Sequence, residues 1–583
     1  MFSSLSGKQR QIVFDKSGKF VVRACPGSGK TYSVAARLAH RITSWASPRR
    51  GIAALSFTNV AWQEVSRQLN ETFGLSASCS YPHFLGTLDS FINQYIFLPF
   101  GHLVMQCSRR PILVGEPHGS WNYCPRERCY EQYFGIVSFD VDDKLIYPEI
   151  QDAFFFRYST IIKNDGTESE HAKHLREIKK QFWKKGFATQ ADANYFAVKI
   201  VENYPAIAKS LISRFPEFII DEAQDTSEVQ MKLIDLLVEN GLEDIVLIGD
   251  PDQAIFEWNN ARPELFIKKY DEWESNSVIL DENRRSSQNI CDFTAKLSSL
   301  PHTSVAINDE VKDLTLAPEI VSYNHNDPDS IHGVIQSFIE KCQNNNICTL
   351  PNKIAVLVRS KNFIDIVMGN PSATQNPPPE RPWVADDSIT KDVVKAKFLI
   401  DNASFKKGYK LIEKAIVKSE LNKMQCLNDD IQARIDKLGF IQHRKNIYEI
   451  ANLLPKTEDA TIDKWIDGAC TALADVGLKL NIADNNTTPI NDLFQKECQI
   501  APSGQYRLGT VHSVKGETFD AVLLLLKKKG VGKYYKTLLQ EGAKTGQNEE
   551  LRIAYVAMTR PRKLLIIAVP QDAESAWKSY FGV

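Results

Sequence analysis

The chain lacks a long hydrophobic run and an excess of either charge. No stretch approaches the ~18 apolar residues of a membrane span, and the first ten residues contain no apolar signal core. We therefore expect a cytoplasmic protein that does not enter a membrane. Lys and Arg total 70 against 71 Asp and Glu, a formal net charge of −1. This balance neither indicates nor excludes nucleic acid, because a local groove can bind DNA on a protein that is acidic elsewhere.

The eleven cysteines also lack a regular spacing. Cys124 and Cys129 lie close together, with Cys107 and His118 nearby, which is compatible with a zinc site. Zinc ligands usually come as CxxC-like pairs, and none is present, so the composition favours reduced thiols.

What the chain does contain is an alternation of short apolar runs with helical patterns. Its 583 residues suffice for three or four domains of ~150 residues, and 43% hydrophobic content allows a large core. This rhythm predicts parallel α/β sheets covered by helices. We expect strands at Phe20–Arg23, Ile52–Ser56, Phe218–Ile220, Ile245–Ile248, Val278–Leu280, Glu319–Tyr323, Ile354–Val358, Ala521–Leu526 and Leu564–Val569, and helices at Thr31–Ile42, Ala61–Phe73, Ser227–Glu239 and Ser286–Leu297.

Two segments interrupt the alternation. Residues 93–205 are irregular and then helical, and residues 362–505 are mostly helical after a proline-rich linker at 371–382. The sequence therefore predicts two α/β cores, each with a mostly helical insertion. The first core would comprise 1–92 and 206–275, and the second core 276–361 and 506–583.

A glycine-rich loop follows the first expected strand. Gly27, Ser28 and Gly29 allow backbone N–H groups to surround phosphate oxygens. Lys30 adds a positive charge near the β- and γ-phosphates, and the Thr31 hydroxyl can hold Mg²⁺. The loop predicts a nucleoside triphosphate site.

An acidic cluster ends the strand Phe218–Ile220. Asp221 can present a carboxylate to Mg²⁺, and Glu222 is a candidate general base for the attacking water. Phosphoryl transfer also needs positive charge on the far side of the γ-phosphate. Arg285 and Arg560 are the candidates, although each alone is typical of a surface ion pair.

The order of these segments resembles that of superfamily 1 DNA helicases of the UvrD/Rep/PcrA kind. The resemblance covers about residues 1–92, 206–360 and 506–572 and is weak in the two insertions. It implies an α/β fold with two RecA-like parallel-sheet cores that form an ATP cleft. It also implies ATP and Mg²⁺ as ligands and 3′-to-5′ movement on single-stranded DNA.

The resemblance assigns further nucleotide contacts. Gln9, in Leu5–Gln9, would contact the adenine, and Gln253 would sense the γ-phosphate. In the family, Arg and Tyr sandwich the adenine; here the matching positions are Tyr32 and Arg284, so the residue types are exchanged. We hypothesise that the sandwich persists with its partners swapped, because stacking works from either face. Glu517, one residue from the family's acid, is the candidate ribose contact.

The resemblance also implies single-strand contacts. An aromatic face stacks any base at ~1–3 kcal/mol without reading sequence, which suits Trp258, although a core tryptophan is the alternative. Asp89 stands where the family usually has His. The expected DNA contacts are Phe57, Thr58, Asn59, Thr87, Phe256, Trp258, Thr510 and His512.

Two basic stretches lie outside these motifs. Lys173–Lys185 includes Phe182 and Trp183, and Lys527–Lys536 interleaves lysine with aromatics. Both suit phosphate contact with stacking, but the composition slightly favours a solvated basic loop for each.

The leading interpretation is an ATP-dependent DNA helicase or translocase that acts on single strands and duplex junctions, in DNA repair or anti-phage defence. The alternative is an ATP- and DNA-sensing regulator that controls a partner nuclease without unwinding. Short UvrD-like proteins of this kind occur as helicase subunits of anti-phage systems such as Gabija, beside a nuclease. Lys30, Glu222, Arg285 and Arg560 are all present, which favours real hydrolysis.

Overall fold

The computed structural model describes residues 2, 4–57, 59–75, 81–115, 118, 137–146, 170–255, 261–368, 388–401, 405–421, 426, 428–458, 460–482, 487–494, 505–527, 545 and 548–583. The chain forms two compact units. Unit 1 comprises Met1–Pro117, Tyr130–Gly369 and Ile500–Val583, and unit 2 comprises His118–Cys129 and Asn370–Gln499.

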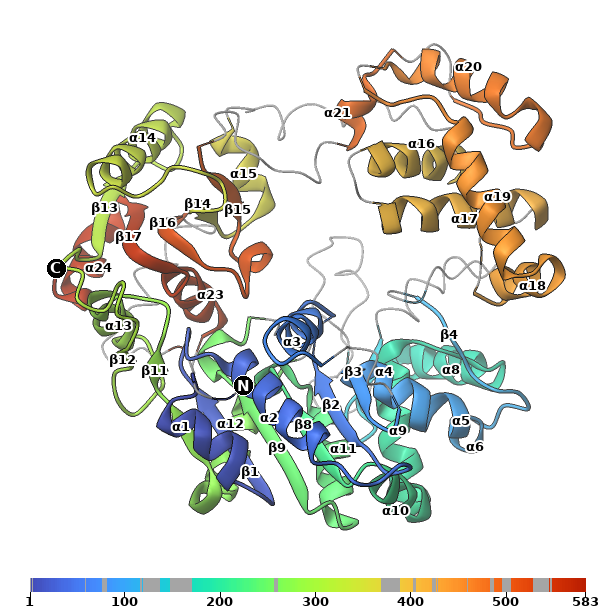
Figure 1. Ribbon diagram of the computed structural model, residues 1–583, viewed down its shortest axis with the longest axis horizontal. Coiled ribbons are helices and arrows are strands. Elements are labelled where there is room, and N and C mark those ends of the chain that lie inside the picture. The colour runs from blue at the N-terminus through green and yellow to red at the C-terminus, as the bar shows by residue number, and fades with distance from the viewer. Residues whose placement is uncertain are drawn as a thin grey trace. The chain divides into compact units, whose positions relative to one another are not determined.

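Unit 1 contains a six-stranded sheet near the N-terminus, drawn mainly in blue and green (Figure 1). All of its strand pairs are parallel. The order is β10 (Val278–Leu280), β1 (Lys19–Ala24), β9 (Asp244–Gly249), β8 (Glu217–Ile220), β2 (Ile52–Ser56) and β3 (Phe84–Thr87). The covering helices include α2 (Lys30–Thr43), α3 (Asn59–Glu71), α11 (Glu228–Glu239) and α12 (Pro263–Glu272).

A second parallel sheet in unit 1 has five strands. Their order is β13 (Glu319–Tyr323), β17 (Pro561–Pro570), β16 (Phe519–Leu525), β14 (Ile354–Val358) and β15 (Arg507–Thr510). Alternate residues enter two separate hydrophobic clusters: Val522 and Leu524 in one, Ala521 and Leu523 in the other. Side chains alternate along a strand, so both faces of the sheet are covered. The helices around it are α13 (Gln288–Ala295), α14 (Pro328–Asn344), α15 (Lys361–Val367), α23 (Glu549–Met558) and α24 (Glu574–Phe581).

The first insertion belongs to unit 1. It continues from β3 through α4 (Leu88–Ile92), the π-helix η2 (Asn93–Phe97), α5 (Leu98–Phe100) and α6 (His102–Met105). After the short strands β4 (Ile112–Leu113), β5 (Ser138–Phe139) and β6 (Leu145–Ile146) come α8 (Glu170–Lys184), β7 (Phe187–Ala188), α9 (Gln190–Asn203) and α10 (Pro205–Arg214). A buried ion pair, Lys179 to Asp192 at 2.6 Å, ties α8 to α9.

The described part of unit 2 is helical. Its helices are α16 (Ser388–Asp401), α17 (Phe405–Leu421), α18 (Asn428–Leu438), α19 (Phe440–Leu453), α20 (Ile462–Ala472) and α21 (Ile490–Phe494). A hydrophobic cluster around Trp465 holds them together. His443, fully buried, lies between Arg434 at 2.9 Å and Glu413 at 2.7 Å, which joins α17, α18 and α19 by polar contacts.

The predicted α/β class with two parallel sheets is confirmed. One boundary was wrong: Val278–Leu280, assigned to the second core, pairs with β1 as an edge of the first sheet. The apolar run showed a strand there but not which sheet it would join. Within the described segments, every helix is too short or too polar to cross a bilayer.

Candidate nucleotide and DNA site

The phosphate loop connects β1 to α2. Gly27 and Gly29 have φ of 73° and 78°, a backbone conformation that favours glycine. A Cβ at Gly27 would lie 2.7 Å from the Cβ of Arg285, and one at Gly29 would lie 3.0 Å from Nε2 of Gln9. The loop therefore needs glycine both for its shape and for the chain segments packed against it. Helix α2 begins at Lys30, so its free N–H groups face this loop.

Carboxylates follow two neighbouring strands of the first sheet, β8 and β9. Asp221 and Glu222 come directly after β8, and Asp250 comes directly after β9. Because β8 and β9 are parallel neighbours, their ends meet at one edge of the sheet. Glu222 has φ of 54°, a strained conformation for a residue with a side chain. Gln224 donates to Glu222 at 2.5 Å and accepts from the Asp250 N–H at 3.0 Å, which fixes the cluster.

These charges act strongly on one another. Removal from water lowers the pKa of Lys30, but Glu222, Asp250 and Asp221 raise it, and the net shift is upward. Burial and the charge of Glu222 raise the pKa of Asp221. Burial also acts to raise the pKa of Glu222, but Lys30 and Lys515 outweigh it, and the net shift is downward. Glu222 is thus held ionised, as a base requires, while burial and the charge of Glu222 outweigh Lys30 and Lys515 at Asp221.

Two arginines from the second core reach this cluster. Arg560 is 1% exposed, and its Nη2 donates to Oε1 of Gln253 at 2.6 Å. Arg285 donates to the carbonyl of Thr559, the residue before Arg560, at 2.9 Å. Burial lowers the pKa of both guanidinium groups, that of Arg285 to about 10. The charge of Arg560 therefore acts on Lys30, Asp250 and Glu222, and that of Arg285 on Asp250; we call this group of residues, where the two cores meet, the cleft.

The predicted adenine-side residues also lie together. Gln9 is fully buried; its Nε2 donates to the carbonyl of Ser28 at 3.4 Å, and its Oε1 accepts from Arg284 at 3.0 Å. The Tyr32 hydroxyl lies 2.6 Å from Ser4 Oγ, and its ring lies 5.6 Å from that of Phe73. Gln9, Ser28 and Arg284 thus form one group. Glu517 instead pairs with Arg507, so its predicted ribose role stays a prediction.

The residues present fit a nucleoside triphosphate with Mg²⁺. Within the described residues, Ser28 Oγ and Asp221 Oδ2 are buried and have no hydrogen-bond partner. Buried polar atoms are usually paired, so both atoms are available to pair with a ligand. Asp221 and Thr31 supply the hard oxygen donors that Mg²⁺ prefers. The loop N–H groups and Lys30 supply the positive field that phosphates prefer.

Two predicted DNA contacts occupy equivalent positions in the two sheets. Edge strand β3 ends in Leu-Gly-Thr at Thr87, and edge strand β15 ends in Leu-Gly-Thr at Thr510. Each threonine hydroxyl accepts from the N–H three residues on, at 3.1 Å in Ser90 and 3.3 Å in Ser513. Both strands were missed by sequence reasoning. The repeated Leu-Gly-Thr was the available signal.

Other predicted DNA contacts are placed only in part. Phe57 follows β2, and His512 Nε2 lies 3.2 Å from the carbonyl of Ile255. Thr58, Phe256, Trp258 and the side chain of Asn59 lie outside the described residues, as do Cys124, Cys129 and the linker 371–382. Asp89 accepts from Gln230 of α11 at 2.9 Å and from Asn194 of α9 at 3.1 Å, so it joins the first core to its insertion.

The stacking suggested for the stretch 173–185 is wrong. Phe182 and Trp183 are each 9% exposed, and Trp183 packs against Phe196 at 4.7 Å between ring centroids. Helix α8 has a helical period, so its aromatic residues face the core, while Lys180 and Lys184 are exposed and Lys179 is buried against Asp192. Of the second stretch, only Lys527 lies in the described part of the chain.

Several residues that sequence reasoning left out complete the cleft. Lys515 donates to the buried Asp225 at 2.7 Å and so connects the two cores. Burial raises the pKa of Asp225 and of Asp250, each to about 6. Asp225, Asp250 and Lys515 each lie three residues from a predicted site residue (Glu222, Gln253 and His512), and this proximity was the available signal. The pairing of Lys515 with Asp225, 290 residues apart, could not be predicted from the sequence.

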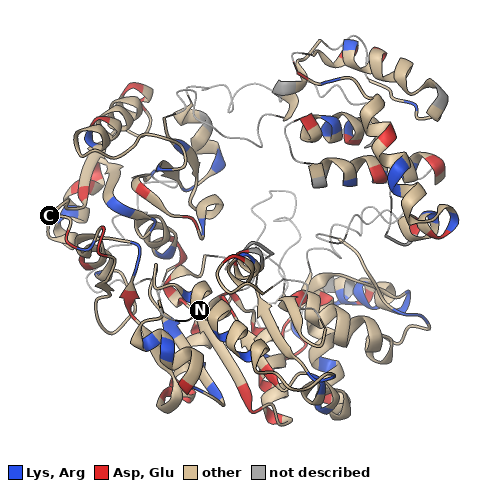
Figure 2. Cartoon of the chain, viewed as in Figure 1, with Lys and Arg blue, Asp and Glu red and all other residues tan. Residues whose placement is uncertain are grey.

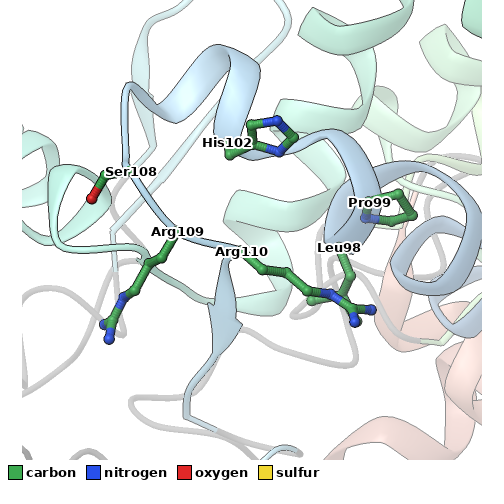
Figure 3. A pocket seen from close by; sticks show the side chains of 6 residues that line it. All are labelled: Leu98, Pro99, His102, Ser108, Arg109 and Arg110. Carbon is green, nitrogen blue, oxygen red and sulfur yellow. The ribbon is translucent and has the colours of Figure 1, made fainter.

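A surface pocket of about 510 Å³ lies on the first insertion, away from these residues (Figure 3). Leu98, Pro99, His102, Ser108, Arg109 and Arg110 line it, and none of these six is acidic. Elsewhere in the described chain, basic and acidic side chains are interspersed on most elements (Figure 2). Arg109 donates to the carbonyl of Lys185 at 2.9 Å and lies 4.8 Å over the ring of Phe187.

Comparison with known proteins agrees with this geometry. The model of the UvrD/REP helicase N-terminal domain matches residues 5–106 and 130–274, and that of the UvrD-like helicase C-terminal domain matches 399–572. The chain belongs to the UvrD/Rep helicase family. The two matches together cover more than half of it, including both sides of the cleft.

Individual relatives cover different parts. DNA helicase II of Haemophilus influenzae is 24% identical over 51% of this chain and 40% of its own length. The exonuclease/helicase protein RexA of Streptococcus pneumoniae is 34% identical over 18% of this chain, which is 9% of that protein. YjcD of Bacillus subtilis, a candidate ATP-dependent DNA helicase, is 21% identical over 97% of this chain and 79% of its own length. The chain thus spans less than half of the first two relatives.

Proposed function

We propose that this protein is an ATP hydrolase that is stimulated by DNA and moves 3′ to 5′ along single strands as a helicase or translocase. The observation that carries the proposal is the cleft in which Lys30, Asp221 and Glu222 of the first core face Arg285 and Arg560 of the second. Family membership supports the DNA substrate. The direction of movement rests on the family resemblance.

The residues of the cleft have separable roles in hydrolysis. Glu222 accepts a proton from the water whose oxygen attacks the γ-phosphorus, as the bond from that phosphorus to the β–γ bridging oxygen breaks. Lys30, Arg285 and Arg560 stabilise the charge that develops on the phosphate oxygens. Gln253 touches Arg560 and senses which nucleotide is present. Mg²⁺ held by Thr31 and Asp221 would neutralise phosphate charge.

Single-strand contact would be divided between the cores. Thr87 and Thr510 stand at equivalent edges of the two sheets, so each core has one contact of the same kind. If ATP binding closes the cleft and hydrolysis reopens it, the distance between these contacts changes in each cycle. This alternation is what directional movement on a strand requires. Phe256 and Trp258 remain the proposed stacking residues.

Duplex junctions have a candidate contact in the basic pocket of the first insertion. The side chains of Arg109 and Arg110 point in different directions (Figure 3). Arg109 donates to the carbonyl of Lys185, whereas Arg110 makes no polar contact with the described residues. Spread charges suit a row of phosphates better than one small anion, and among the described residues no Phe, Tyr or Trp lines the pocket, whose one aromatic ring is the imidazole of His102. Arg110→Glu should weaken binding of blunt duplex more than that of single strands.

The test of the function is an ATPase assay with and without single-stranded DNA, followed by strand separation on 3′-tailed and 5′-tailed duplexes. DNA-stimulated hydrolysis with opening of the 3′-tailed duplex alone is expected. No hydrolysis under any condition, or hydrolysis that Lys30→Ala leaves unchanged, would contradict the proposal. Arg49→Ala, which removes one exposed charge outside the cleft, is the control.

The alternative function is regulation of a partner nuclease. It is favoured by the similarity of residues in this chain to RexA, a protein named for both exonuclease and helicase activity. Strong DNA-stimulated hydrolysis without strand separation, together with a nuclease that copurifies from native cells, would support it. DNA repair and anti-phage defence are both compatible with either function, and the identity of the copurifying protein distinguishes them.

A further inference from the structure

Four consecutive residues of the first core are held by the second core. They are Asp252 to Ile255, which follow β9 and precede the proposed stacking residues; we call them the strap. Gln253 contacts Arg560 at 2.6 Å, and Arg552 donates to the Ala254 carbonyl at 2.7 Å. Ile255 is fully buried in the hydrophobic cluster of the second core. The strap is therefore attached to the second sheet although the chain enters it from the first.

Asp252 makes the densest of these attachments. Its side chain is fully buried, and both oxygens accept from second-core residues. Oδ1 lies 2.5 Å from Ser299 Oγ and 2.5 Å from Thr545 Oγ1, and Oδ2 lies 2.6 Å from Ser298 Oγ and 2.9 Å from the Ser299 N–H. Hydrogen bonds to an ionised acceptor are about twice as strong as neutral ones.

The hydroxyl protons are directed toward Asp252 by the surrounding donors. Arg23 can only donate, and its Nη2 lies 2.8 Å from Ser299 Oγ, so that hydroxyl accepts from Arg23 and gives its own proton to Asp252. The Leu300 N–H donates to Ser298 Oγ at 3.1 Å, and Ser298 also forms a side-chain hydrogen bond with Tyr555. Thr545 also lies 3.1 Å from the Leu297 carbonyl, so its proton is shared.

We propose that Asp252 is a positioning residue for ATP hydrolysis, which clasps the second core and thereby holds Gln253 against Arg560. Asp252 and Gln253 are neighbours in one short 3-10 helix, Pro251–Gln253. A displacement of Asp252 therefore moves Gln253, whose other contact is the Asp250 carboxylate of the nucleotide cleft. The inference rests on the proposed ATP hydrolysis.

The hydrogen bonds between Asp252 and the second core, which we call the clasp, also locate the pivot between the cores. The strap stays with the second core as long as the hydrogen bonds to Asp252 persist, so opening of the cleft must bend the chain before it, at Asp250–Pro251. The chain returns to the first core at Ala261 and Arg262, which pair with Ser227 and Thr226.

Thr545 offers a matched pair of variants that leave the carboxylate in place. Thr545→Val keeps the shape and removes the donor, whereas Thr545→Ser keeps the donor. We expect Thr545→Val and Asp252→Asn to lower kcat by roughly 10- to 100-fold, the range for a small displacement of a catalytic group, with KM for ATP nearly unchanged. Thr545→Ser should stay within about threefold of the parent.

A double-variant comparison separates positioning from general destabilisation. If Asp252 acts through Gln253, Asp252→Asn should cost less than about twofold in a Gln253→Ala background. Equal loss in both backgrounds, or a loss in Thr545→Ser as large as in Thr545→Val, would overturn the proposal. These outcomes are read against the hydrolysis rate of the parent protein.

Hydrogen exchange tests the clasp independently of ATP hydrolysis. In nucleotide-free protein, Thr545→Val should speed amide exchange in the peptide containing residues 252–255 at least several-fold and leave α2 unchanged. Unchanged exchange in that peptide would overturn the clasp even in an active enzyme. Faster exchange in a protein that fails to hydrolyse ATP would instead leave the clasp standing and remove the proposed function.

Discussion

The two cores meet in two regions that differ in how fully their polar atoms are paired. In the nucleotide cleft, Ser28 Oγ, Asp221 Oδ2 and Arg284 Nε are buried without a partner among the described residues. At the strap, Asp252 has four donors on two oxygens. Both regions are built from residues far apart in the sequence, and both join the same two sheets.

The difference reflects what each region has to hold. An unpaired buried polar atom costs stability until a ligand pairs it, so the cleft gains most when nucleotide and metal arrive. The Asp252 carboxylate already accepts four hydrogen bonds, so it gains none from a ligand and resists separation of the strap from the second core. The cleft is therefore the part of the contact that should respond to ligand, and the strap the part that should persist through the cycle.

The largest expected effect comes from removing the base of the cleft. Glu222→Gln keeps the shape and the hydrogen bond to Gln224 but cannot accept the proton, so kcat should fall by roughly 100- to 10,000-fold. ATP affinity should be kept. Steady-state ATPase and nucleotide binding measure the two quantities. Glu228→Gln, in the first turn of α11, is the control; a loss of similar size there would argue against a specific role for Glu222.

For stability, in contrast to kcat, a substitution at the strap should have a larger effect than one in the cleft. Asp252→Ala leaves three hydroxyl or amide donors unpaired in a buried site and should lower the free energy of unfolding by about 3 kcal/mol. Glu222→Gln removes a charge that raises the pKa of Asp221, so it should unfold at or above the temperature of the parent. Thermal unfolding without nucleotide checks both. A loss for Glu222→Gln as large as that for Asp252→Ala would remove the contrast.

The adenine side of the cleft should respond more weakly. Tyr32→Ala and Arg284→Ala should each weaken ATP binding by about threefold to thirtyfold, as expected for one lost stacking or cation–π contact. Equilibrium binding of a fluorescent ATP analogue measures the change. Tyr448→Ala, a surface tyrosine of unit 2, should leave the affinity unchanged. Unaltered affinity in both cleft variants would mean that the exchange of residue types is coincidental.

The smallest expected effect is a pH dependence from Asp225, which lies in the cleft opposite Lys515. Burial raises its pKa to about 6, although Lys515 lowers it, against ~3.9 in an unfolded chain. The folded state then holds this proton more tightly. The contribution to stability is complete below pH ~4 and is lost as the pH rises through 6.

Asp225→Asn should therefore show a smaller decline in melting temperature between pH 5 and pH 7 than the parent, by a few degrees at most. Melting curves at both pH values, in the same salt, measure the difference. Profiles that run parallel would show that Asp225 does not titrate in this range. Asp309→Asn, an exposed carboxyl, should leave the profile of the parent unchanged.

Much of the fold was predictable because it is encoded locally. The nine expected strands all occur, several with identical bounds, such as Ile52–Ser56 and Ile354–Val358. Strands β3 and β15 were missed because they have only two apolar residues and one apolar residue, respectively, before Gly-Thr, which is too short for a periodic pattern. Trp183 was misjudged because composition marks a basic, aromatic stretch without saying which face of a helix is buried.

The sequence by itself determined the phosphate loop, the acids that end β8 and the positions of nine strands along the chain, since each depends on residues close together in the chain. Only the tertiary structure decided which sheet β10 joins, that Arg560 meets Gln253, and that Ser298, Ser299 and Thr545 converge on Asp252. Those contacts join residues 46 to 307 positions apart. Packing of two sheets creates them, and no local pattern of residues records how two sheets will meet.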